Sequence, residues 1–148
     1  MRVLLVCSPG GHLQQMLALR PAWEGDHSWA SLHGPDTDTL LAGETVDFGH
    51  GPTNRSITNL FRNLRFAHSV LRRRRPEVIL STGAGLAVPF FLVGRCLRIR
   101  CVYVESLTRT ESISVSGRLV YPLAHRFFAQ WPAAADRLRR AEYAGRIL

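Results

Sequence analysis

The sequence predicts an α/β domain: a Rossmann-like, doubly wound and mostly parallel sheet with helices on both faces. Short, nearly continuous apolar runs, such as Arg2–Cys7 and Val78–Ser81, alternate with longer segments whose apolar residues recur at helical spacing. That alternation is typical of parallel strands that crossover helices bury on both faces. Glycine-rich turns follow both of these runs. The length of 148 residues fits a single domain, residues 1–148.

The first part of the chain is expected to begin with a strand and a helix. Arg2–Cys7 is apolar after its first residue and ends in the turn Ser8–Gly11, as a buried strand does. Through His12–Trp23, apolar residues recur at helical spacing. A short strand at Trp29–Leu32, a helix capped by Asp36 or Thr37, and a second short strand at Thr45–Phe48 complete this part.

The middle of the chain predicts a long amphipathic helix. Over Ile57–Leu71, apolar residues recur at three- and four-residue steps with arginines on the other side, and Pro76 ends the pattern. Val78–Ser81 is expected as a buried strand, and the almost wholly apolar segment Leu86–Leu97 as a helix broken near Pro89. The remaining expected elements are a strand at Cys101–Val104, a helix at Ser116–Ala124, a strand at Arg126–Ala129, a short helix at Ala133–Arg140 and the tail Tyr143–Leu148.

The charge indicates an anionic partner. There are 19 basic residues, all of them arginine, and 11 acidic ones, which gives a net charge of +8. Such a balance favours phosphates, acidic lipids or nucleic acid. The arginines are spread along the chain, with no basic strip interleaved with aromatic residues and no recognition helix, so nucleic acid is not an expected partner.

The three cysteines give no sign of a metal site or a disulfide framework. Cys7, Cys96 and Cys101 form no C-x-x-C pair and have no zinc-like spacing to a histidine. Cys7 and Cys101 lie in apolar runs and are expected in the core. We therefore expect no metal and a reducing compartment.

Four noteworthy turns follow expected strands: Ser8–His12, Ser81–Gly85, Glu105–Arg109 and Gln130–Pro132. Because the carboxyl ends of parallel strands meet at one edge of the sheet, a ligand site is expected there. The dinucleotide fingerprint G-x-G-x-x-G is absent, and no acidic residue ends the second strand. Nicotinamide binding is therefore not favoured.

Two residues of these turns are candidate catalytic groups. His12 stands where the first helix begins, and a general base there would take a proton from an acceptor hydroxyl. Its alternative role is to cap the helix or to bond the turn. Glu105 follows a buried strand and would position sugar hydroxyls or serve as the base, unless it only pairs locally with Arg109. A base supplied by another chain is the third option.

The other residues of these turns suit a phosphate-bearing ligand. Glycines let the backbone approach a ligand closely, and helix N-termini present free N–H groups to an anion. The alternative is that both glycine turns serve only helix packing. The candidate substrate-binding residues are Gly10, Gly11, Thr82, Gly83, Gly85, Ser106 and Arg109, and the last can hold a phosphate through two hydrogen bonds.

The apolar segment Leu86–Leu97 allows two interpretations. A helix of this length spans roughly 18 Å, too short for a bilayer core of about 30 Å. It is either a core helix or a surface anchor. In an anchor, Phe90 and Phe91 would enter lipid while Arg95 and Arg98 meet anionic headgroups. Neither a signal peptide nor a membrane-spanning segment is expected.

Four motifs in this order make the whole chain resemble one known family: Pro9–His12, Ser81–Gly85, Tyr103–Arg109 and Gln130–Pro132. The chain is similar to the accessory, membrane-associated subunit of split GT-B glycosyltransferases. The eukaryotic representative works with a catalytic subunit to add the second N-acetylglucosamine to dolichol-diphosphate-N-acetylglucosamine. Bacterial relatives serve capsule and exopolysaccharide assembly on undecaprenyl-diphosphate sugars. The N-terminal domain of the peptidoglycan enzyme MurG is a more distant likeness.

The resemblance implies half of an enzyme, the N-terminal half of a GT-B fold. A catalytic partner subunit would bind most of the UDP-sugar donor, and this chain would supply the side of the cleft for a polyprenyl-diphosphate-linked acceptor. The chain would be inactive alone, would need no cofactor or metal, and would support an inverting transfer in capsule or exopolysaccharide synthesis. Residues that would contact the partner are Gln130, Trp131, Ile147 and Leu148.

The resemblance also implies that the chain works at a membrane. The eukaryotic member has an N-terminal transmembrane helix with no counterpart in this sequence, so a surface patch would hold the chain on the cytoplasmic, inner face of the membrane. The alternative to the whole interpretation is a freestanding Rossmann-like module that binds a nucleotide or serves regulation. Tight nucleotide binding by the lone chain would favour that module.

Overall fold

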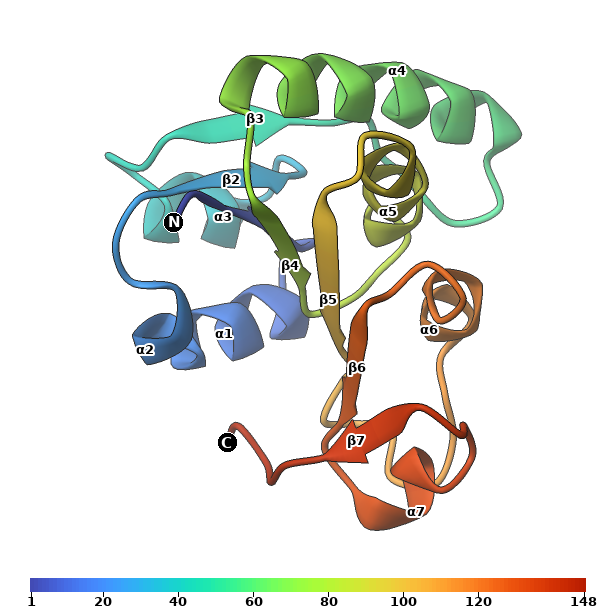
Figure 1. Ribbon diagram of the computed structural model, residues 1–148. Coiled ribbons are helices and arrows are strands. Elements are labelled where there is room, and N and C mark those ends of the chain that lie inside the picture. Colours follow the sequence, from blue (N-terminus) through green and yellow to red (C-terminus); the bar gives the residue numbers. More distant parts are fainter.

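The structure is a computed structural model that describes residues 1–148. Its centre is one sheet of seven parallel strands in the order β3-β2-β1-β4-β5-β6-β7 (Figure 1). The strands are β1 (Val3–Val6), β2 (His27–Ser31), β3 (Val46–Phe48), β4 (Val78–Ser81), β5 (Arg100–Val104), β6 (Arg126–Ala129) and β7 (Ala141–Tyr143). The predicted Rossmann-like fold class is confirmed. All carboxyl ends of the strands therefore lie at one edge.

Helices cover both faces because the strand residues alternate between two apolar cores. In β1, Leu4 and Val6 belong to the larger core of 21 buried residues, while Val3 and Leu5 belong to the smaller core of 10. The larger core packs under α4 (Ile57–Arg74), α5 (Ala87–Cys96), α6 (Val115–Val120) and α7 (Pro132–Ala135). The smaller one packs under α1 (Gly11–Ala18), α2 (Arg20–Trp23) and the end of α3 (Pro35–Leu40). Figure 1 shows these two groups of helices on opposite sides of the sheet.

Proline explains three differences from the predicted helices. The helix expected over His12–Trp23 is two helices that meet at Leu19, because Pro21 has no N–H to continue α1 and instead lies in the first turn of α2. The helix expected to run to Ala124 ends at Val120, just before Pro122. The break expected near Pro89 is wrong: Pro89 lies in the first turn of α5, where its missing N–H costs nothing.

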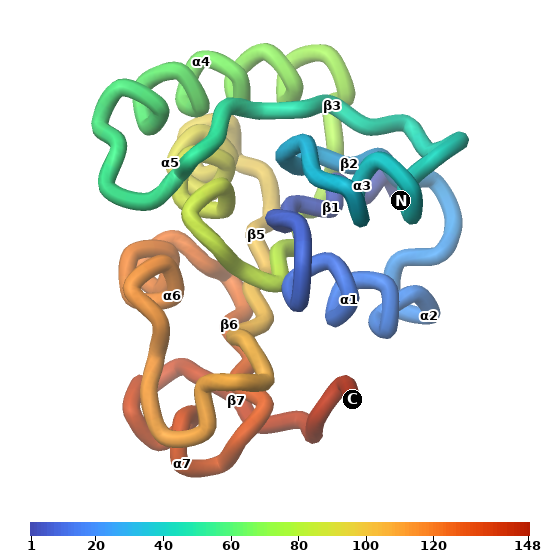
Figure 2. Tube along the Cα trace, turned by 180° about the vertical axis from the view of Figure 1, so that it is seen from behind, coloured from blue at the N-terminus to red at the C-terminus, as the bar shows by residue number.

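The end of the chain also differs from the prediction. The helix expected over Ala133–Arg140 is the short α7, and the chain then forms β7, which the sequence analysis missed. β7 is a three-residue edge strand, and Glu142 on it accepts two hydrogen bonds of 2.6 Å from Arg126 of the neighbouring strand. After β7, the tail returns to the side of the sheet that carries α1 and α2 (Figure 2).

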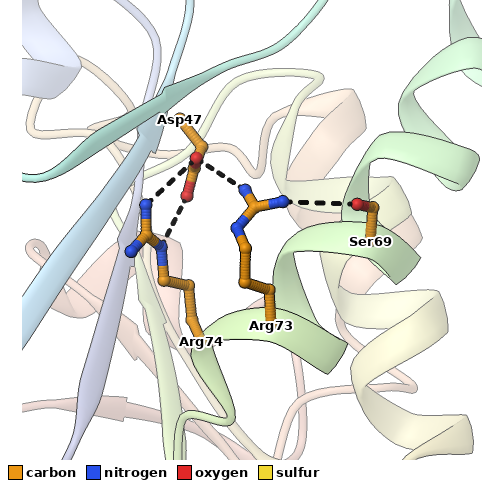
Figure 3. A network of polar contacts seen from close by, with 4 residues as sticks. All are labelled: Asp47, Ser69, Arg73 and Arg74. Carbon is orange, nitrogen blue, oxygen red and sulfur yellow. Dashed lines mark hydrogen bonds and ion pairs between the residues drawn. The ribbon is translucent and has the colours of Figure 1, made fainter.

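A network of polar contacts attaches the far end of α4 to the edge strand β3 (Figure 3). The Asp47 carboxylate accepts a hydrogen bond of 2.7 Å from Arg73 and bonds of 2.9 and 3.2 Å from Arg74. Asp47 also raises the pKa of the Arg74 guanidinium through this hydrogen bond. These two arginines are thus used by the fold itself.

No helix of the structure is both long enough and apolar enough to cross a bilayer.

Candidate active site at the carboxyl edge of the sheet

The four predicted turns meet at one place. They follow β1, β4, β5 and β6, which are neighbours in the sheet. The strand order changes direction between β1 and β4, because β1 leads on one side to β2 and on the other to β4. In open α/β sheets, ligands bind at the carboxyl ends of the strands at such a switch point.

Two reciprocal hydrogen bonds join the first and second turns. The Nδ1 atom of His12 lies 2.8 Å from the carbonyl oxygen of Thr82, and the Thr82 hydroxyl donates to the carbonyl of His12 at 2.7 Å. Thr82 is fully buried. The expected substrate-binding role of Thr82 is therefore replaced by a positioning role, because its hydroxyl is already used inside the protein.

This contact fixes the tautomer of His12. A carbonyl oxygen can only accept, so Nδ1 carries the hydrogen and donates it to Thr82. In the neutral ring, Nε2 then keeps its lone pair, and no protein atom is hydrogen-bonded to it. The His12 side chain is half-buried. An oriented imidazole with a free basic nitrogen at the ligand edge is the arrangement that a general base requires.

Gly83 and Gly85 are glycines for local steric reasons. Gly83 has φ +118°, and a Cβ there would lie 3.0 Å from the His12 ring and 3.1 Å from the Tyr103 hydroxyl. A Cβ at Gly85 would lie 2.7 Å from the hydroxyl oxygen of Thr53. Only glycine lets this turn approach His12 and the loop before α4 so closely.

Some backbone amides of the two glycine turns are already used inside the protein, and others are free. The N–H of Gly10 is donated to the Asp36 carboxylate, and that of Gly83 to the Ser81 hydroxyl. These two glycines thus shape the turns and offer no free amide. The N–H groups of Gly11, His12, Ala84 and Gly85 have no acceptor in the protein. They lie where α1 and α5 begin, so the helix dipoles add to their attraction for an anion.

Glu105 is not placed to act as a base. It is 1% exposed, and its carboxylate accepts hydrogen bonds of 2.9 Å from the backbone N–H groups of Ser106 and Ser114. The Ser114 hydroxyl lies 3.0 and 2.9 Å from its two oxygens, and a Cβ at Gly117 would collide with one of them. A carboxylate enclosed in this way cannot reach an acceptor hydroxyl. The structure corrects the expectation: Glu105 supports the loop and the start of α6.

Ser106 and Arg109 end in different surroundings. Ser106 is buried, and its hydroxyl lies 3.0 Å from that of Thr108. Arg109 is exposed and forms no ion pair, so the alternative of a local pair with Glu105 is wrong. Its guanidinium is available to an anionic ligand at the rim of the site.

Tyr103 is a site residue that the sequence analysis missed. It is fully buried, and its hydroxyl lies 3.5 Å from that of Ser114. Burial first, and then the nearby charge of Glu105, raise the pKa of Tyr103 far above its ordinary value. Its phenol thus stays protonated and supports the turn at Gly83. A hydroxyl on an inward position of a predicted strand could have signalled it.

Two buried amides, those of Gln15 and Gln130, connect the remaining turns. The sequence analysis missed Gln15 and assigned Gln130 to a partner. Gln130 donates to Gln15 at 2.6 Å and to the carbonyl of Glu105 at 2.9 Å, and it accepts from the N–H of Ile147. Gln130 is 2% exposed, so its expected contact with a partner is wrong. Trp131 is half-buried and donates to the carbonyl of Leu107 at 2.7 Å. A glutamine on the apolar side of a predicted helix is the one signal for Gln15.

The expected anchor residues divide into two pairs. Phe90 and Phe91 are 0% exposed and belong to the larger core, so their predicted contact with a membrane is wrong. The physical reason is that α5 lies between α4, α6 and the sheet, where an all-apolar helix buries most of its surface. Arg95, in the last turn of α5, and Arg98, just after the helix, are exposed at the end away from the glycine turn.

The cysteines offer no reactive thiol at the site. Cys7 and Cys101 are fully buried, as predicted, and burial raises the pKa of each to about 12. No group of three or more His, Cys, Asp or Glu side chains is arranged to hold a metal ion.

We predict that Gly83→Ala lowers the free energy of unfolding by about 1–2 kcal/mol, because φ +118° strains any L side chain. It should also displace the His12 ring, which the new Cβ would meet at 3.0 Å. Gly43→Ala is the matched control: Gly43 has φ +84° but open space around it. Urea unfolding should show a loss of stability for both variants, and the NMR signals of the His12 ring should shift only in Gly83→Ala. Unchanged His12 signals in Gly83→Ala would contradict the prediction.

The model of a family described as "Oligosaccharide biosynthesis protein Alg14 like" matches residues 50–147, which is most of the chain and includes the second, third and fourth turns. The chain belongs to the Alg14-like family. The predicted resemblance is confirmed.

Two Alg14-like relatives differ in how much they share with the chain. One is the "UDP-N-acetylglucosamine transferase subunit ALG14" of Eremothecium gossypii, 41% identical over 130 residues, which cover 80% of this chain and 57% of that protein. The protein with the same description from Homo sapiens is 24% identical over 99% of this chain and 82% of its own length. The chain thus spans little more than half of the first relative.

Solved structures agree on the fold of this Alg14-like chain. MurG of Acinetobacter baumannii superposes with a TM-score of 0.78 at 14% identity, over 97% of this chain and 44% of MurG. A UDP-GlcNAc 2-epimerase of Methanocaldococcus jannaschii gives a TM-score of 0.71 at 14% identity, over 99% of this chain and 46% of that one. At these identities, the likeness shows the fold alone.

Proposed function

We propose that the chain is the acceptor-side subunit of a two-chain UDP-N-acetylglucosamine transferase. In this proposal it binds a polyprenyl-diphosphate-linked sugar, and a catalytic partner subunit holds the UDP-sugar. The observation that carries the proposal is His12, oriented by Thr82 with its basic Nε2 free, beside four amides that have no acceptor. The family and the word "subunit" in the names of its relatives support it.

The proposed chemistry is an inverting displacement. Nε2 of His12 takes the proton from the acceptor hydroxyl while that oxygen forms a bond to the anomeric carbon of the donor. The bond from the anomeric carbon to the UDP oxygen breaks, and UDP leaves with the electron pair. The amides of Gly11, His12, Ala84 and Gly85 and the guanidinium of Arg109 would hold the diphosphate of the acceptor.

The partner would pack where the sheet has no helix cover. On the side of α1 and α2, Leu80, Val102, Val104 and Phe128 line an apolar pocket of about 360 Å³ together with the tail residues Ala144–Ile147. Ile147 is half-buried there and Leu148 is 66% exposed. Trp131, Ile147 and Leu148 remain our proposed partner contacts. Arg146 lies over the Trp131 ring at 4.7 Å and keeps the tail close.

A lipid-linked acceptor lies in a membrane, so we place the chain peripherally on its cytoplasmic face. The capsule or exopolysaccharide context stays a prediction.

The test is reconstitution with the partner. We expect that the chain co-expressed with the catalytic subunit transfers N-acetylglucosamine from UDP-N-acetylglucosamine to a polyprenyl-diphosphate-linked sugar, and that neither subunit does so alone. Product is measured by mass spectrometry of the lipid fraction. Efficient turnover by the lone chain would refute the half-enzyme proposal. Tight binding of UDP by the lone chain in calorimetry would also refute it and favour the freestanding module.

A further inference from the structure

Away from the chain ends, the most exposed apolar side chains gather on two helices. They are Ile57 (74%) and Phe61 (63%) on α4, and Val115 (75%) and Leu119 (55%) on α6. Leu60 beside them is 38% exposed. Together they account for half of the exposed large apolar residues of the chain. Contiguous apolar surface of this kind marks an interaction site.

All of these residues except Phe61 line a groove of about 840 Å³ between the start of α4 and α6. Val88 of α5 lines it, and one of its lining residues is Gly85, part of the second glycine turn. The groove therefore leads to the candidate active site. Side-chain amides hold its wall in place: Asn59 donates to the carbonyl of Pro52, and Asn63 exchanges two hydrogen bonds of 2.8 Å with the backbone of His50.

The exposed charged side chains of α4, α6 and the loop before α4 have one sign. Neither α4 nor α6 contains an Asp or Glu. Four arginines of this region are exposed and form no ion pair: Arg55, Arg62, Arg65 and Arg118. Arg73 and Arg74, at the far end of α4, instead pair with Asp47. A second copy of the chain would bring arginines against arginines. An apolar strip with unpaired arginines beside it matches an anionic lipid surface.

We propose that the membrane-docking face of the protein consists of Ile57, Leu60, Phe61, Val115 and Leu119 with the surrounding arginines, and that it binds an anionic bilayer. The apolar side chains enter the interface, and the arginines meet the phosphates of the headgroups. This inference rests on the proposed function, since the groove then connects the bilayer with the diphosphate site at Gly85. This face takes the place of Phe90 and Phe91 as the proposed membrane contact, because those two side chains are buried in the core.

The test is binding of the full chain to vesicles without donor, acceptor or partner, so that its result does not depend on transfer. We expect sedimentation with vesicles of phosphatidylglycerol and phosphatidylcholine, weakened by salt, and little with phosphatidylcholine alone. The variant Ile57→Ser with Phe61→Ser and Val115→Ser should lower the affinity about tenfold or more. The double variant Arg62→Gln with Arg65→Gln should weaken it and reduce the salt dependence. Leu40→Ser, at a residue 45% exposed on α3, should bind as the native chain does.

A second measurement does not depend on loss of binding. Trp fluorescence of Phe61→Trp should shift to the blue with the anionic vesicles and be quenched by bromine-labelled lipids, whereas Leu40→Trp should not change. The proposal is overturned if the native chain does not bind anionic vesicles, or if the triple Ser variant binds them as well as the native chain does. It is also overturned if bromine-labelled lipids do not quench the fluorescence of Phe61→Trp. Loss of partner binding by a triple variant that still binds vesicles would assign this surface to a protein instead.

Discussion

His12→Ala is expected to lower sugar transfer by the assembled enzyme about 10²- to 10⁴-fold, the usual contribution of a general base. The substitution removes the nitrogen that would take the acceptor proton, while the backbone of the turn and its amides remain. Because the half-buried ring makes a single hydrogen bond, the free energy of unfolding should fall by only about 1 kcal/mol. Single-turnover transfer and urea unfolding of the same preparation separate the two effects.

Thr82→Val is the matched control for the positioning of His12. It removes the hydroxyl that donates to the His12 carbonyl but keeps the Thr82 carbonyl that orients the ring. We expect a smaller loss of transfer than for His12→Ala. If His12→Ala turns over at the native rate in a folded complex, His12 is not the base, and the partner must supply it.

Glu105→Ala is expected to lower the free energy of unfolding by about 3 kcal/mol. The reason is that the backbone N–H groups of Ser106 and Ser114 lose their buried acceptor, and the cap of α6 loses its support. Equilibrium unfolding in urea, followed by circular dichroism, measures the change. Glu111→Ala, at an exposed carboxylate, should leave the unfolding midpoint where it is.

Glu105→Gln distinguishes support from catalysis. Its amide keeps one acceptor oxygen but turns an NH₂ group toward donors, so stability should fall by less than for Glu105→Ala. If Glu105→Gln kept full stability while transfer in the complex stopped, the carboxylate would have a catalytic role that its enclosure does not allow.

Much of the sheet follows from the sequence because its strands are short, largely apolar runs between helical segments. Val78–Ser81 and Arg126–Ala129 were predicted with their observed bounds. Once the strands are parallel, the turns after β1, β4, β5 and β6 must share an edge, so the place of the site was also predictable. His12 and the glycine turns lie there.

What the sequence could not supply is which side chains face solvent. An almost wholly apolar helix has no polar stripe, so nothing in Leu86–Leu97 separates a core helix from an anchor, and Phe90 and Phe91 were misplaced. The roles of Glu105 and Gln130 depend on partners 9 to 115 residues away in the chain. Such pairings exist only after folding. Arg109 is exposed in the turn after β5, and its contact with a phosphate stays a prediction.

The group that orients His12 is a main-chain carbonyl, not a carboxylate. A carbonyl fixes the ring but carries no negative charge, so no carboxylate of this chain is hydrogen-bonded to the imidazolium that would form during transfer. In the proposed complex, the ligand's phosphates would have to balance that cation, and turnover would then depend on lipid diphosphate in a way that a diphosphate-free sugar acceptor could not reproduce.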